Sequence, residues 1–282
     1  MTEDVTGHAA GHESGNATGG VALTLDLGNS SVSVACVGPA GAVRLAANKV
    51  GELDAQLLVG CLERAAAGGA SPRFAAISAV GTLAEEQRLR GLLEGMGLGV
   101  VVNPDSGLEL RLDHPETCGR DRLYGARGAL EELGRGARPA GVLVVDAGTA
   151  VTVDAVLPTA AGGVFLGGAI APGPGTLAEG LTQAGARLPD FTLRADAPAL
   201  GRSTEEALQA GVVVGFRGAV ELLARSIVEE AFGGAAGVEG FVTGGARHLA
   251  FDGVAAGLGR RPTEVELLVH LGLAAAARPC FP

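Results

Sequence analysis

Two segments of the chain place an aspartate and a glycine inside an otherwise apolar run, and this repeated pattern constrains the fold most. The first is LTLDLGNSSVSVACV (residues 23–37) and the second is LVVDAGTAVTVDAV (residues 143–156). In each, a strand-like segment ends in Asp-x-Gly, after which come a small polar residue and a second β-branched segment. A single hairpin of this kind would be ordinary, because glycine and asparagine favour tight turns. Two of them, at Asp26 and Asp146, open the two halves of the chain and indicate an internal duplication.

Predicted strands and helices alternate in both halves, on either side of a glycine- and proline-rich break at residues 134–141. Before the break, the pattern predicts strands at residues 21–27, 32–37, 74–80 and 99–103 and helices at 54–67, 83–95 and 121–133. After it, strands are predicted at 142–147, 151–156, 164–170 and within 240–245, and helices at 176–186, 204–230, 246–258 and 266–277. This order predicts an α/β chain with an N-terminal lobe at 20–137 and a C-terminal lobe at 138–282. We expect the polar, glycine-rich residues 1–19 to form a disordered tail.

An aspartate at the end of a strand, followed by glycine, places a carboxylate beside backbone N–H groups that a phosphate can approach closely. The carboxylate itself cannot bind phosphate, but it can hold the cation that accompanies nucleotide phosphates. Two such turns facing each other across a cleft would clamp a metal–nucleotide complex, as in the actin-like, sugar-kinase-like ATP-binding fold. The simpler alternative is a pair of surface hairpins without a ligand.

Two further segments carry residues suited to substrate binding. In HPETCGRDRLYGARGAL, Gly119, Asp121 and Arg122 lie where a loop is expected to become a helix. An ionised aspartate there can accept a proton from a substrate hydroxyl, and the neighbouring arginine can bind a carboxylate. The alternative is a helix cap and a surface ion pair. In FVTGGARHLA, Gly244 and Gly245 precede a helix and leave bare backbone for an adenine or a phosphate, although such a turn is also routine.

Several function classes are disfavoured by the sequence. A net charge of −10 argues against nucleic acid as a partner, since phosphate backbones require basic surface. No G-x-x-x-x-G-K-[ST] motif is present, and GPGTLA (residues 173–178) is interpreted as a turn into a helix rather than a dinucleotide site. The four cysteines lack the spacing of zinc ligands and are expected to be reduced thiols. We expect no signal peptide and no membrane partner.

Taken together, these motifs resemble the type III pantothenate kinases of bacteria, from about residue 21 to the C-terminus. In chain order they are DLGNSS, GRDR, DAGTAVTVD, GGAIAPG, STEEALQAGVVVGF and VTGG. The resemblance implies two ribonuclease-H-like lobes of the actin-like ATPase fold, with the active site in the cleft between them. It also implies transfer of the γ-phosphate of ATP to pantothenate, which gives 4'-phosphopantothenate in the first step of coenzyme A synthesis. The implied cofactors are ATP, Mg²⁺ and a monovalent cation (K⁺ or NH₄⁺), and the implied assembly is a cytoplasmic homodimer.

The same resemblance implies roles for individual residues. Asp121 would be the catalytic base for the pantothenate hydroxyl, Asp26 would bind Mg²⁺ and Asp146 would bind K⁺. The residues implied to contact ATP or its phosphates are Asp26, Gly28, Asn29, Ser30, Gly148, Thr149, Gly244 and Gly245. Those implied to contact pantothenate are Gly119 and Arg122 of the same chain, together with Thr204 of the partner subunit.

Three positions depart from the usual pattern of the family, of which Ser203, in place of a usual asparagine ahead of Thr204, is the milder change. Arg120 stands where a small residue is common, and Leu112 stands where an aromatic residue is usual. These replacements leave open a kinase that acts on a different small alcohol with the same scaffold. A second alternative is a catalytically weakened accessory protein that binds nucleotide, although retention of all three motif aspartates favours an enzyme.

Overall fold

A computed structural model describes residues 21–134, 138–185, 188–189 and 191–281. The expected tail at residues 1–19 lies outside this described part. The first sheet has the strand order β3-β2-β1-β4-β5, in which β2 is antiparallel to β1 and β4 is parallel to it. Its elements, with the two helices between its strands, are β1 (Ala22–Leu27), β2 (Ser31–Gly38), β3 (Gly41–Lys49), α1 (Ala55–Ala67), β4 (Phe74–Ala79), α2 (Leu83–Gly95) and β5 (Gly99–Val102).

The second sheet repeats this topology. Its order is β11-β10-β7-β8-β9-β6, with β8 antiparallel to β7 and β10 parallel to it. The strands are β6 (Leu108–Leu110), β7 (Gly141–Ala147), β8 (Ala150–Thr159), β9 (Gly162–Pro172), β10 (Val238–Thr243) and β11 (Thr263–Glu264). Strands β7 to β11 therefore occupy the places of β1 to β5, which is the duplication that the two Asp-x-Gly turns predict.

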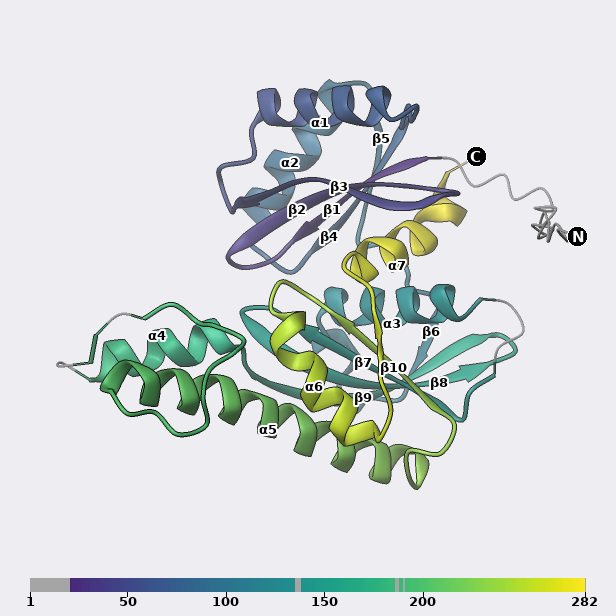
Figure 1. The fold of residues 1–282 in the computed structure, drawn as a ribbon. Coiled ribbons are helices and arrows are strands. Elements are labelled where there is room, and N and C mark those ends of the chain that lie inside the picture. Colours follow the sequence, from purple (N-terminus) through teal and green to yellow (C-terminus); the bar gives the residue numbers. More distant parts are fainter. Residues whose placement is uncertain (1–20, 135–137, 186–187, 190, 282) are drawn as a thin grey trace, which may run out of the picture.

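The remaining helices complete a stack of layers (Figure 1). They are η1 (Pro115–Thr117), α3 (Arg120–Leu133), α4 (Pro174–Ala184), α5 (Thr204–Phe232), α6 (Arg247–Leu258), α7 (Leu268–Ala277) and η2 (Arg278–Cys280). Helices α1 and α2 pack on the outer face of the first sheet, and α5 and α6 pack on the outer face of the second. Helices α3 and α7 lie between the sheets, in contact with each other and with strands of both. The predicted two-lobed α/β fold of the actin-like type is confirmed.

Strand alternation decides which side chains face this middle layer, because successive side chains point to opposite faces of a sheet. Leu23, Leu25 and Leu27 pack outward against α1 and α2, so Thr24 and Asp26 point inward. The same holds in β7, where the side chains of residues 143, 145 and 147 belong to the outer core and those of 142 and 144 to the inner one. Asp146 therefore points inward as well. Each of the two motif aspartates thus faces the opposite lobe.

Some elements differ from the sequence-based expectation. Strands β3, β6 and β11 were not predicted. Strand β3 is an edge strand whose residues are mostly exposed and lack a strong alternating pattern, and β6 and β11 have only 3 and 2 residues. Strand β6 lies within the predicted N-terminal lobe but pairs with β9 of the second sheet, and α7 lies within the predicted C-terminal lobe but packs on β1 and β4. The lobe boundary near residue 137 stays a prediction. Strand β6, from before this boundary, joins the second sheet, and helix α7, from after it, packs on the first sheet.

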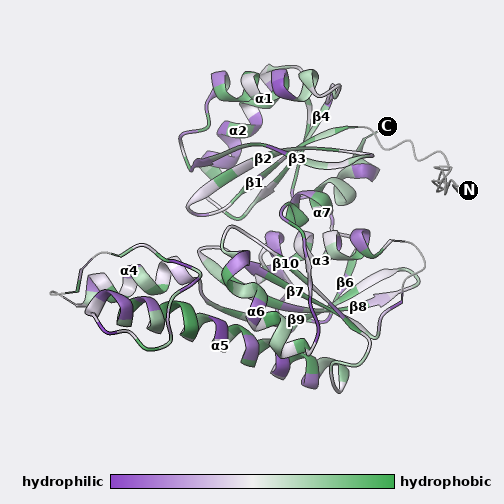
Figure 2. Cartoon of the chain, in the orientation of Figure 1, coloured by the Kyte–Doolittle hydropathy of each residue, from purple (hydrophilic) through white to green (hydrophobic). Residues whose placement is uncertain are grey.

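Helix α5 is long and apolar enough to cross a membrane, with a mean hydropathy of 1.4 in its most apolar window. One of its faces nevertheless carries Val213, Phe216, Val220, Ala224 and Val228, all buried in the core against α6. Hydrophobic and hydrophilic bands alternate along the helix in Figure 2. This pattern is typical of a helix that packs on one side against a protein core.

Candidate active site

A cleft of about 420 Å³ opens between the two sheets at the ends of their central strands. It is lined by residues of β1, β2, β3, β7, β8 and β10, by the start of α3 and by the start of α7. Asp26, Asp121 and Asp146 all line it. Of the other residues predicted to bind ATP or substrate, the cleft contains Gly28, Asn29, Ser30, Arg122, Gly148, Thr149, Gly244 and Gly245. The two Asp-x-Gly turns therefore meet at one cleft, and that they bind a ligand there stays a prediction.

The two strand aspartates have equivalent neighbours in their sheets. Asp26 lies between Ser33 on the antiparallel strand and Ser78 on the parallel strand. Asp146 lies in the same way between Thr152 and Thr243. Each carboxylate is thus flanked by small hydroxyl side chains, which leave room for a ligand.

Burial and the repulsion of neighbouring charges raise the pKa values of the Asp26 and Asp146 carboxyl groups. Burial, and then the charge of Asp121, raise the pKa of Asp26 to about 6. Burial, and then the charges of Asp26 and Asp121, raise the pKa of Asp146 to about 7. Among the described residues, the buried Oδ1 of Asp26 has no hydrogen-bond partner. Such a cluster strongly favours a cation, which would offset the repulsion and the lost hydration.

Both Asp-x-Gly turns are closed by one short backbone hydrogen bond. The N–H of Gly28 donates to the carbonyl of Ser31, and the N–H of Gly148 donates to the carbonyl of Ala150, both at 2.9 Å. The first turn is one residue longer, since β1 pairs Leu27 with Val32 while β7 pairs Ala147 with Val151. This extra residue explains why the apolar patterns of the two segments shift by one position after the glycine.

Gly244 closes the cleft from β10. Its φ of +90° lies in the left-handed region, and a Cβ at this position would overlap the Asp146 carboxylate and the carbonyl of Ala147. Gly245 has open space where a Cβ would be. The first glycine is thus required by the backbone, and the second leaves its backbone accessible from the cleft.

Helix α3 begins at the cleft and presents Asp121 from its first turn. Gly119 is the N-cap residue, and Asp121 Oδ1 accepts a hydrogen bond from the N–H of Arg122 at 2.9 Å. The guanidinium of Arg122 donates from Nε to Asp154 Oδ1 at 3.0 Å and lies 5.4 Å from the centre of the Phe165 ring. Asp154 is almost completely buried, so this ion pair fixes the direction of Arg122 at the edge of the cleft.

The donor set fits a metal–nucleotide complex better than a preformed metal site. Among the described residues, no three His, Cys, Asp or Glu side chains are grouped so that they could hold a metal ion. Mg²⁺ is usually bound by one or two carboxylates together with waters and substrate phosphates. Asp26 lies next to a glycine turn and has an oxygen without a hydrogen-bond partner in the described part of the chain, so it is suited to that mode of binding.

Four of the residues considered in the sequence are not among those that line the cleft. Gly119 is the N-cap residue of α3, directly before the cleft-lining start of that helix. Thr204 is exposed at the start of α5, next to its N-cap residue Ser203. Arg120 is exposed, and Leu112 packs against the core around Phe165. Within the described chain, neither replacement of a family residue therefore reshapes the cleft.

Sequence reasoning missed several residues that line the cleft or, like Asp154, lie behind it. His270 is buried on α7 between Thr24 and Ser33, more than 230 positions away in the sequence. Arg44 of β3 donates to Glu266 at 3.1 Å across the cleft mouth. Asp154 had a usable signal, since it interrupts the apolar run of β8, whereas the positions of Arg44 and His270 depend on long-range topology.

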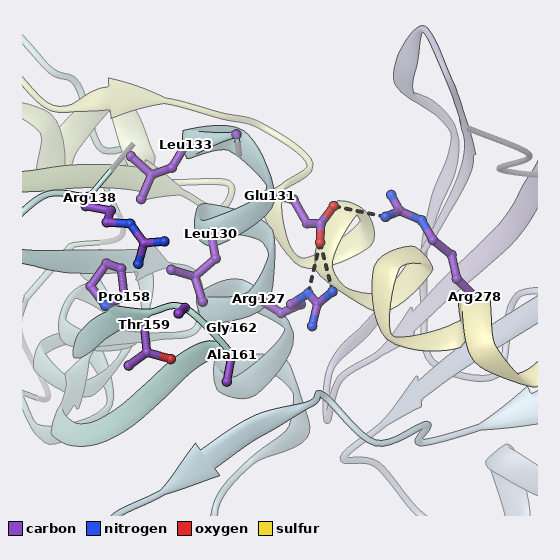
Figure 3. Close-up of a pocket in the computed structure, with 12 residues that line it drawn as sticks. Arg127, Leu130, Glu131, Leu133, Arg138, Pro158, Thr159, Ala161, Gly162 and Arg278 are labelled. Atoms are coloured by element: carbon purple, nitrogen blue, oxygen red, sulfur yellow. Dashed lines mark hydrogen bonds and ion pairs between the residues drawn. The ribbon is translucent and has the colours of Figure 1, made fainter. Parts of the chain in front are cut away.

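A second cavity, of about 500 Å³, lies beside the end of α3 and the β8–β9 hairpin (Figure 3). Its Arg127 and Arg278 both bind Glu131, at 2.9 and 3.0 Å. This network links α3 to the C-terminal η2 turn. Both arginine charges are paired with the Glu131 carboxylate. None of the three motif aspartates lines this cavity.

Comparison with known proteins identifies the family. A family model described as type III pantothenate kinase matches residues 22–226, which is most of the chain. The chain belongs to this family. It is 40% identical over 162 residues to the type III pantothenate kinase of Thermus thermophilus, a match that covers 57% of this chain and 62% of that protein. It is 38% identical over 235 residues to that of Halorhodospira halophila, covering 79% and 86% of the two chains. The chain thus spans less than two thirds of the Thermus relative and most of the Halorhodospira one.

Solved structures support the same fold at much lower identity. One is described as a conserved Baf family transcriptional activator from Campylobacter jejuni, with a TM-score of 0.53 at 19% identity over 92% of this chain and 98% of that one. Another is the ethanolamine utilization protein EutJ from Carboxydothermus hydrogenoformans, with a TM-score of 0.53 at 14% identity over 90% and 89%. At these identities the likeness concerns the fold alone.

Proposed function

We propose that this protein transfers the γ-phosphate of ATP to the hydroxyl of pantothenate, as the first step of coenzyme A synthesis in the cytoplasm. One observation carries the proposal: three aspartates from distant parts of a type III pantothenate kinase chain line one cleft between two equivalent lobes. Phosphoryl transfer consists mainly of positioning and charge stabilisation, so a small set of such groups is sufficient.

In this proposal the nucleotide lies across the two glycine turns. Asp26 holds Mg²⁺, which neutralises phosphate charge when it is bound, and Gly28, Asn29 and Ser30 cradle the phosphates. On the other lobe, Thr149 lies beside the phosphates while Asp146 holds the monovalent cation. Gly148, Gly244 and Gly245 give the nucleotide close access to backbone. The raised pKa values of both strand aspartates support cation binding, because a bound cation favours the ionised form.

Asp121 is the proposed base for the acceptor hydroxyl. It lies in the first turn of α3, where the helix N-terminus stabilises an ionised carboxylate. Gly119 lets the chain approach the acceptor, and Arg122, held by Asp154, binds the pantothenate carboxylate. Arg120 and Leu112 are not among the residues lining the described cleft, which favours pantothenate over a different alcohol.

A homodimer is part of the proposal. Ala207, Gly211, Val214, Gly218 and Leu222 form an exposed stripe of small and apolar residues along α5, on the side opposite its core face. Gly211 and Gly218 have open space where a Cβ would be, although glycine inside a helix costs about 1 kcal/mol relative to alanine. Packing against the same helix of a second copy would explain this cost, and the family resemblance implies that Thr204 of the partner subunit then contacts the acceptor.

The reaction itself is the test. Purified protein with ATP, Mg²⁺, K⁺ and pantothenate should form phosphopantothenate, detected by mass spectrometry. Asp121→Asn should lower kcat by about 10²–10⁴-fold, since the base is lost, while binding of Mg²⁺–ATP is retained in calorimetry. Asp113→Asn, at an exposed aspartate on the preceding loop, is the matched control and should keep full turnover.

Two results would refute the proposal. One is a folded wild-type protein that makes no product with any monovalent cation. The other is an Asp121→Asn variant as active as the Asp113→Asn control. A panel of other small alcohols in the same assay identifies a different acceptor if pantothenate fails while ATP still binds.

A further inference from the structure

The buried histidine of the cleft joins two hydroxyl groups of the first sheet. His270 Nδ1 lies 2.9 Å from Thr24 Oγ1, and its Nε2 lies 2.7 Å from Ser33 Oγ. His270 is only 3% exposed, and burial lowers its pKa to about 3. His270 is therefore neutral at physiological pH, with one ring nitrogen that donates and one that accepts.

The bond to Ala35 decides which nitrogen carries the proton. The Thr24 hydroxyl donates its single proton to the carbonyl of Ala35 at 3.2 Å. Toward His270 the same oxygen can then only accept, so Nδ1 must be the N–H donor. Nε2 is left without a proton and accepts the hydroxyl proton of Ser33 at 2.7 Å.

This chain of hydrogen bonds has a consequence inside the cleft. Ser33 lines the cleft and is the cross-strand neighbour of Asp26 on the same face of the sheet. Side chains directly opposite each other in an antiparallel pair have Cβ atoms about 4.5–5.5 Å apart. Since the Ser33 proton points to His270, its oxygen presents only lone pairs to the cleft and gives no proton to Asp26.

We propose that Ser33 is an oxygen acceptor for the hydrated divalent cation held at Asp26, and that His270 and Thr24 are positioning residues that fix its polarity. The Ser33 oxygen would accept a hydrogen bond from a water on the cation, next to a carboxylate that binds the cation itself. A hydroxyl free to rotate would offer its proton to a phosphate oxygen or to Asp26 instead. This inference rests on the proposed use of Mg²⁺–ATP and adds the group that orients the water shell of the metal.

The first test is the tautomer of His270 in the protein without metal or nucleotide. Long-range ¹H–¹⁵N correlation spectra should show a protonated Nδ1 and an unprotonated Nε2 from pH 8 down to about pH 5, in line with the low pKa. The signals are assigned by their loss in His270→Gln. A ring protonated at Nε2, or a doubly protonated ring at pH 7, would overturn the proposal. This experiment needs neither nucleotide nor turnover, so its outcome is independent of the proposed reaction.

The second test is the gain in ATP affinity that Mg²⁺ provides, measured by calorimetry with and without the metal. Ser33→Ala should reduce this gain by roughly tenfold, as is usual when a group that orients a metal's ligands is removed, and should leave metal-free ATP binding unchanged. Thr24→Val, which nearly preserves shape outside the cleft, should reduce the gain partly and yield a mixture of ring tautomers. An unchanged gain in Ser33→Ala contradicts the proposal, as does equal weakening with and without Mg²⁺.

Ser106→Ala is the matched control for loss of a buried hydroxyl. Ser106 is 2% exposed and its oxygen accepts from the N–H of Leu108, away from the cleft. The Ser106→Ala variant should have a lower melting temperature, and the effect of Mg²⁺ on its ATP binding should be unchanged. If Mg²⁺ strengthens ATP binding as described but the protein does not phosphorylate pantothenate, then the proposed function is refuted and the proposal for Ser33 is not.

Discussion

At the scale of single residues, the aspartates that are proposed to bind cations lower the stability of the cation-free fold. The pKa of Asp146 is raised to about 7, whereas an unfolded aspartate titrates near 3.9. The unfolded chain therefore releases this proton first, and the carboxyl group destabilises the fold increasingly as pH rises from about 4 to about 7. Asp146→Asn should consequently raise the melting temperature of the cation-free protein at pH 8 by roughly 5 °C or more, and should have little effect near pH 4.

The Asp113→Asn change removes a charge at an exposed position and serves as the reference for this pH series. A cation reverses the comparison: K⁺ should stabilise the wild-type protein at pH 8 and leave Asp146→Asn unaffected. If Asp146→Asn were less stable than the wild type at pH 8 without cations, then its carboxylate would stabilise the fold, and the electrostatic account given for the cleft would be wrong.

At the scale of elements, the sequence predicts what depends on local pattern and misses what depends on packing between distant elements. The Asp26 and Asp146 turns were predictable, because alternation and glycine mark both strand ends. The helix that carries His270 was predictable too. Its place between the sheets was not, since α7 is apolar on all sides and its pattern selects no face. The pairing of His270 with Ser33 follows from that placement alone.

Helices α3 and α7 cross with their backbones in direct contact, and this contact depends on two glycines. A Cβ on Gly272 would overlap the carbonyl of Tyr124, and a Cβ on Gly128 would overlap that of Leu268. Because both obstacles are backbone atoms, Gly272→Ala must separate the helices and should lower the free energy of unfolding by about 2–3 kcal/mol in urea titrations. Gly91→Ala, at an exposed position of α2 with open space around the new methyl group, should raise it by about 0.5–1 kcal/mol. Equal changes in the free energy of unfolding for Gly272→Ala and Gly91→Ala would show that the backbones of α3 and α7 are not in direct contact.

At the scale of the whole molecule, the proposed site is complete only when two chains supply it. Asp121 lines the cleft of its own chain, while Thr204 is exposed on α5 and does not line that cleft. If Thr204 of the partner subunit contacts the acceptor, Asp121→Asn and Thr204→Val each inactivate both sites of their own homodimer. A mixed dimer, however, has one site with both substitutions and one site with neither.

Unfolding and refolding the two inactive variants together should therefore restore activity. Random assembly gives mixed dimers in about half of the population, each with one intact site, so about a quarter of the wild-type rate is expected for a C2 dimer. If Thr204 served the cleft of its own chain, every site in the mixture would carry one defect and no activity would return. Refolding each variant alone gives the baseline, and light scattering establishes that the mixture is dimeric. The measured rate thus distinguishes a shared site from a self-contained one without a structure of the assembly.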